Sequence, residues 1–140
     1  MTGRGIIVSS WVGDLVFAAT AIPAAAGVHA FEGVALATAL ALFFASLPAW
    51  AWAFVVAASR SAQGDDIVIG NMFGSIGGAT RDVRVHLFGA LAVCIVVAVA
   101  TITTEPFGIM VPMLPLGFVG LWAARHGSFP PRRETGTRRA

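Results

Sequence analysis

The segment of residues 34–58 carries no charged side chain and is long enough to cross a lipid bilayer as one helix. A membrane-spanning helix needs about 20 mostly apolar residues, because each residue advances the helix by only about 1.5 Å. Residues 6–28, 85–104 and 107–124 form three further apolar segments. The sequence therefore predicts an all-α, polytopic membrane protein whose single domain, residues 1–125, contains four transmembrane helices.

The composition supports a membrane environment, since 57% of the 140 residues are hydrophobic and only 11% are charged. Soluble domains have about 25% charged residues. This chain lacks the polar surface that a water-exposed globule needs, so lipid must cover much of it. The excess of positive charge is explained by membrane topology, and we expect no nucleic-acid partner.

All nine basic residues are Arg, and they occur at only three places along the chain. They are Arg4; Arg60, Arg81 and Arg84; and Arg125, Arg132, Arg133, Arg138 and Arg139. Positive charge beside membrane spans stays on the cytoplasmic side. The pattern predicts that both termini and the loop of residues 60–84 are cytoplasmic. Using Arg and never Lys, in a chain rich in Ala and Gly, is typical of a GC-rich bacterial genome, so we expect the membrane to be a bacterial plasma membrane.

Residues 126–140 form a basic tail with two prolines, which we expect to be disordered. Arginines beside a membrane are attracted to anionic lipid, each by about 1 kcal/mol. The expected lipid headgroup contacts are Arg125, Arg132, Arg133, Arg138 and Arg139.

The first apolar segment contains Asp14, an acidic residue within a predicted span. If the helix starts near Gly5, Asp14 lies close to mid-membrane, where carboxylates are usually functional or paired and favour the protonated form. If it starts near Val12, Asp14 lies at the inner interface. The segment also has a short basic start, as a signal peptide does, but Asp14 interrupts its apolar core.

The loop of residues 60–84 contains an unusually apolar stretch, residues 67–78, which is too short to span the bilayer. Gly70, Gly74 and Gly78 are spaced four apart and would form one flat face on a helix, suited to packing against another helix or a partner. Glycine also disfavours helix. The stretch is therefore re-entrant, helical or irregular. Asn71 lies within it and is a second candidate, with Asp14, for an ion or proton site.

We find no pattern typical of an enzyme, a metal centre or a cofactor site. His29, His86 and His126 are not spaced as metal ligands, and the one cysteine, Cys94, cannot form an intramolecular disulfide. The residues at 70–75 lack the lysine of a phosphate-binding loop.

The chain resembles a group of small actinobacterial integral membrane proteins of unknown function. The residues that carry the resemblance are Val83-Arg84, residues 87–92, Val111-Pro112-Met113, Gly117, Gly120-Leu121-Trp122, residues 124–127 and residues 129–132. The resemblance covers about the C-terminal half. It implies four helices in the plasma membrane and implies no activity.

The function expected from the sequence is non-enzymatic: an accessory or structural subunit of a membrane complex. Such a subunit would contact the lipid bilayer and either a partner membrane protein or a second copy of itself. The alternative is a small proton- or ion-coupled transporter or channel that uses Asp14.

Overall fold

The computed structural model describes residues 3–67 and 79–131, and in these ranges the protein is built from helices. The elements are α1 (Gly3–Ala25), η1 (His29–Phe31), α2 (Glu32–Ala62), α4 (Arg81–Ala100), η3 (Pro106–Met110) and α5 (Met113–His126). Four helical segments, the last made of η3 and α5 together, are long and apolar enough to cross a membrane. The prediction of an all-α protein with four membrane-length helices is confirmed.

The helix ends differ from the predicted spans by a few residues. Helix α1 starts at Gly3 rather than at residue 6, and α2 continues beyond residue 58 to Ala62. Helix α4 already begins at Arg81, inside the predicted loop of residues 60–84. Hydropathy locates the apolar part of a helix, whereas the backbone hydrogen bonds continue into its polar ends.

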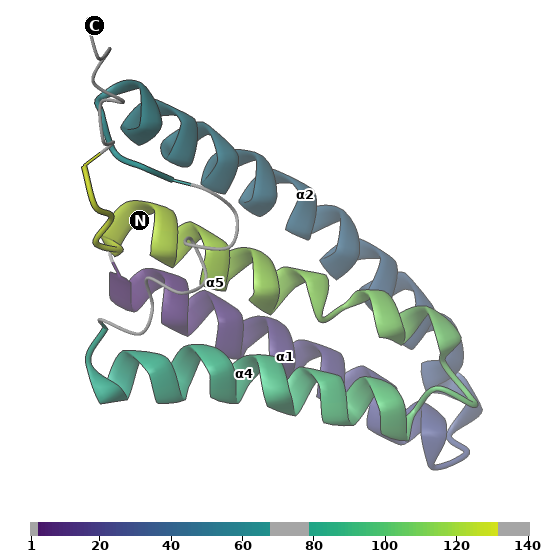
Figure 1. The fold of residues 1–140 in the computed structure, drawn as a ribbon. Coiled ribbons are helices and arrows are strands. Elements are labelled where there is room, and N and C mark those ends of the chain that lie inside the picture. The colour runs from purple at the N-terminus through teal and green to yellow at the C-terminus, as the bar shows by residue number, and fades with distance from the viewer. Residues whose placement is uncertain (1–2, 68–78, 132–140) are drawn as a thin grey trace, which may run out of the picture.

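The helices run alternately in opposite directions (Figure 1). The start of α1, the end of α2, the start of α4 and the end of α5 lie together at one end of the bundle. The short connections that contain η1 and η3 lie at the opposite end. Both ends of the described chain therefore lie at the same end of the bundle, as an even number of crossings requires.

Helix α5 is the centre of the bundle, although it is the shortest of the four. It packs against α1, α2 and α4, and its most extensive contact is with α2. Small residues permit this close approach: a Cβ added at Gly117 would lie only 3.1 Å from the indole ring of Trp50 on α2. The Nε1 of Trp50 donates a hydrogen bond of 3.1 Å to the carbonyl oxygen of Met113, which fixes that ring against α5.

The two prolines of the fourth span lie where α5 begins. Pro112 is the residue before the first turn and Pro115 lies within that turn. The first backbone N–H groups of a helix have no acceptor inside the helix, so a proline there removes no helical hydrogen bond. The fourth span therefore consists of the 3₁₀ segment η3 followed by an α-helix.

The predicted basic tail differs from the structure in its first residues. His126 is the last residue of α5, and the following strand-like segment pairs with the residues after α2. The amide of Asp66 donates to the carbonyl of Pro130 at 2.9 Å, and Asp65 and Pro131 form an isolated antiparallel bridge. Phe129 packs against the apolar core, and its burial favours this arrangement.

Candidate functional site

Asp14 lies halfway between the two ends of α1 and is buried, with 4% of its surface exposed. The helix starts at Gly3, so Asp14 is not at a helix start. Both carboxyl oxygens are enclosed, and neither has a hydrogen-bond partner among the described residues. A buried carboxyl group without partners is costly and needs an explanation.

Two other buried polar side chains lie near this carboxyl group. Ser10 precedes Asp14 by four residues, and both residues belong to the buried face of α1. The Ser10 hydroxyl also lacks a partner in the described part of the chain. Cys94, from α4, is buried and close enough for its thiol to interact with the Asp14 carboxyl. The structure thus brings the Cys94 thiol of α4 to the Asp14 carboxyl of α1, with Ser10 one turn before Asp14 on the buried face of α1.

In the sequence, only Asp14 itself indicated a polar site here. Ser10 and Cys94 are small residues in apolar segments, and a Cys in such a segment is usually a packing residue. Only the pairing of α1 with α4 brings Cys94 to the carboxyl group.

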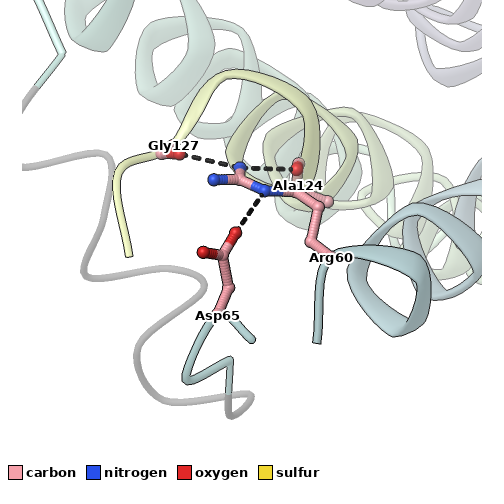
Figure 2. A network of polar contacts seen from close by, with 4 residues as sticks. All are labelled: Arg60, Asp65, Ala124 and Gly127. Carbon is pink, nitrogen blue, oxygen red and sulfur yellow. Dashed lines mark hydrogen bonds and ion pairs between the residues drawn. The ribbon is translucent and has the colours of Figure 1, made fainter. Parts of the chain in front are cut away.

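A second polar network surrounds Arg60, in the last turn of α2 (Figure 2). Its Nε donates to Oδ2 of Asp65 at 2.8 Å. Its terminal nitrogen Nη1 donates to the carbonyl oxygens of Ala124, at 3.0 Å, and Gly127, at 2.8 Å. The guanidinium carbon lies 4.9 Å from the centre of the Phe129 ring, within the range of a cation–π contact.

Arg60 therefore stabilises the C-terminal end of α5. The last carbonyl groups of a helix have no partner inside it and carry partial negative charge, which a cation complements. One half-buried side chain joins the ends of α2 and α5 to the segment after each of them (Figure 2). From the sequence, Arg60 was expected to act only in membrane topology, and its contacts with the end of α5 were not predicted.

At the opposite end of the bundle, a hollow of about 560 Å³ contains the second buried acid, Glu105. Glu105 is 4% exposed, and its Oε1 is enclosed without a partner in the described ranges. Desolvation by this burial raises the pKa of Glu105 above its ordinary value of 4.5. Glu32 also lines the hollow, but its carboxylate is exposed and accepts a 2.8 Å contact from Nδ1 of His29.

An apolar groove of about 370 Å³ runs between α1 and α2, with α5 as its floor. Small residues form much of its two walls: Ser9 and Gly13 on α1, and Ala45 and Ala49 on α2. Apolar side chains complete it, among them the exposed Val16 and Trp52. The groove is thus accessible from the surface that faces the surrounding membrane.

Several predicted site residues lie outside the described residues. They are Asn71, Gly70, Gly74, Gly78, Arg132, Arg133, Arg138 and Arg139. Arg125 is described: it is exposed in the last turn of α5, where contact with lipid headgroups remains a prediction. The structure therefore places Asp14 and Arg125, and the pairing of Asp14 with Asn71 stays a prediction.

No group of three or more His, Cys, Asp or Glu residues that could hold a metal ion lies within residues 3–67 and 79–131. The helices define a multi-pass membrane protein, for which contact with the lipid bilayer follows from its apolar exterior. Comparison with protein-family models, curated proteins and solved structures gives no match. The functional argument therefore depends on the geometry of the chain itself.

Proposed function

We propose that this protein is a non-enzymatic subunit of a membrane complex, located in a bacterial plasma membrane with both termini in the cytoplasm. It would act by packing its helices against a partner membrane protein or a second copy of itself. The observation that carries the proposal is the small-walled apolar groove between α1 and α2.

The composition of the groove is typical of contacts between membrane helices. Lipid tails are as apolar as Leu, so helices associate in a bilayer mainly through close packing, which small residues permit. Ser9, Gly13, Ala45 and Ala49 provide such a surface. A groove of this size accepts several apolar side chains of a partner helix. These side chains would make more van der Waals contacts with the groove than mobile lipid tails do.

Site-specific photo-crosslinking in native membranes tests this proposal. A photoreactive amino acid at Ala45, on the groove wall, should give one discrete protein adduct after illumination. The same amino acid at Val96, which is 66% exposed on α4, serves as the control and should give mainly lipid adducts. Mass spectrometry of the adduct then distinguishes a partner protein from a second copy.

A matched variant shows whether the adduct depends on the groove. Val16→Trp narrows the groove from the α1 side and should reduce the Ala45 adduct severalfold while leaving the Val96 products unchanged. Lipid adducts alone, in equal yield from both positions, would refute the proposal.

The buried Asp14 favours one second candidate, a small proton- or ion-coupled transporter or channel. Charged groups inside membranes often mark ion and proton routes, and this carboxyl group has no partner among the described residues. Ion or proton flux into liposomes should then be much lower for Asp14→Asn than for the unaltered protein. Equal flux from both proteins would remove Asp14 from any transport mechanism.

A further inference from the structure

The polar cluster at the contact between α1 and α4 lies in an otherwise apolar core. Ser10 is 1% exposed, Asp14 is 4% exposed and Cys94 is 1% exposed. Phe17 and Ala21, on the same helix as Asp14, and Ala98, one turn after Cys94, belong to an apolar core cluster that also contains Cys94. The Asp14 carboxyl and the Cys94 thiol that interacts with it therefore lie beside apolar groups that offer no hydrogen bonds.

The hydrogen-bonding capacity of the cluster depends on whether Asp14 carries a proton. An ionised carboxylate only accepts hydrogen bonds, and its charge needs several donors or a cation. The described surroundings supply no cation and, close to the carboxyl group, only the Cys94 thiol as a donor. A carboxylic acid has one O–H donor and an acceptor. The protonated group carries no charge, so its burial beside the Cys94 thiol costs much less free energy than the burial of a carboxylate.

The other charged groups of the bundle lie too far away to replace that proton. Among the described residues of α1, α2, α4 and α5, Cys94 is the one titratable side chain that interacts with the Asp14 carboxyl. His86, two turns before Cys94 on α4, does not contact the carboxyl group; its ring forms a T-shaped contact with the ring of Trp11. Neither Arg60 nor Glu105 acts on the carboxyl, because each lies at an end of the bundle, whereas Asp14 is halfway along α1.

We propose that the Asp14 carboxyl, beside the Cys94 thiol, is a proton-binding site that controls the contact between α1 and α4. With the proton bound, the carboxyl group is neutral and the two helices pack closely. Loss of the proton to water leaves the electron pair and a negative charge on the carboxylate. Hydration of that charge requires α1 to separate from α4 around Asp14. The inference goes beyond the proposed function, because a subunit that transports nothing could carry such a site.

The single cysteine of the chain makes the opening measurable. N-Ethylmaleimide should label Cys94 slowly in liposomes at about pH 6, and labelling should accelerate toward about pH 9 as Asp14 ionises. The Asp14→Asn variant keeps the thiol but has no carboxyl group to ionise. The ratio of the two labelling rates, unaltered protein over Asp14→Asn, should rise about tenfold or more across this range.

The direct electrostatic effect of Asp14 cannot produce that result. A negative charge beside the thiol disfavours the thiolate, so without helix separation the ratio would fall as the pH rises. A ratio that stays constant or falls would overturn the proposal. Crosslinking from Ala45 reports on the groove between α1 and α2. The outcome of the labelling experiment therefore neither supports nor refutes the proposed function.

Infrared spectroscopy shows directly whether Asp14 carries a proton, and it does so even in a variant whose helices pack imperfectly. At about pH 6, the carbonyl stretch of a protonated carboxyl group should be present in the unaltered protein and absent from Asp14→Asn. Glu105→Gln is the control, because Glu105 is the other buried acid in the described chain, and it should retain the Asp14 band. Loss of a carboxylate band instead, on replacing Asp14 by Asn, would overturn the proposal.

Discussion

At the scale of single residues, Arg60 shows how one charged side chain can have both a topological and a structural role. Its guanidinium group joins Asp65, Ala124 and Gly127, which come from segments far apart in the sequence. Hydrogen bonds that involve a charged group are about twice as strong as neutral ones. Arg60 should therefore contribute to stability in a way that the other arginine at the end of α5, Arg125, does not.

Replacing Arg60 by Ala should lower the free energy of unfolding in detergent by about 1–3 kcal/mol, because two helix-end carbonyls and Asp65 lose their donor. Arg60→Lys should recover only part of this, since an ammonium group cannot reproduce the planar fork. Arg125→Ala is the matched control at an exposed position and should change stability little. Equal losses for Arg60→Ala and Arg125→Ala in thermal unfolding would contradict the structural role.

The burial of Glu105 predicts that the free energy of unfolding depends on pH. Its pKa is raised by burial, so the folded state binds the proton more tightly than the unfolded state does. Stability should be highest below the ordinary value of 4.5 and should decrease as the pH rises from there through the raised pKa. Glu105→Gln should reduce this slope, as measured by thermal unfolding at a series of pH values. An unchanged slope in the variant would contradict the assignment.

At the scale of elements, the contact between α2 and α5 depends on the absence of a side chain at Gly117 of α5. The Trp50 indole occupies the space beside Gly117 and is held there by its hydrogen bond to Met113. Gly89 on α4 is different, because an added Cβ would meet Trp11 at 3.7 Å, which is ordinary van der Waals distance. The two glycines therefore form a matched pair for testing close packing.

Gly117→Ala should destabilise the protein by about 1 kcal/mol or more, because the Trp50 ring must move and strain its hydrogen bond. Gly89→Ala should be neutral or slightly stabilising, since Ala favours helix over Gly by about 1 kcal/mol. Thermal unfolding of both variants in the same detergent gives the comparison. A larger loss at Gly89 than at Gly117 would show that the α2–α5 contact is looser than described.

At the scale of the whole molecule, the four membrane-length helices of the described residues alternate in direction, so both described ends lie at one end of the bundle (Figure 1). The Arg pattern predicts that this end is cytoplasmic. Gln63, after α2, and Ala30, in η1, are exposed positions at opposite ends. They suit a test of orientation.

In a Cys94→Ala background, a membrane-impermeant maleimide should label Ala30→Cys in intact cells. Gln63→Cys should react only after the cells are broken, because the positively charged end faces the cytoplasm. Labelling at Gln63→Cys in intact cells, with none at Ala30→Cys, would reverse the orientation.

The four apolar segments were predictable because membrane-spanning length and hydropathy are local properties of the sequence. Residues 34–58 lie within α2, and residues 85–100 of the predicted span 85–104 lie within α4. The central position of α5 was not predictable from the pattern. In a membrane protein, the residues that face lipid and those that face the core are both apolar, so periodicity does not indicate which face is buried.

Membrane-length helices can be predicted from this sequence alone, because bilayer thickness sets a length that can be counted along the chain. The central position of α5, the joining of the ends of α2 and α5 by Arg60, and the approach of Cys94 to Asp14 are set by tertiary packing. These contacts depend on which helices are neighbours and on their rotation about their axes. Close packing of small residues sets both, and it acts between residues that are distant in the sequence.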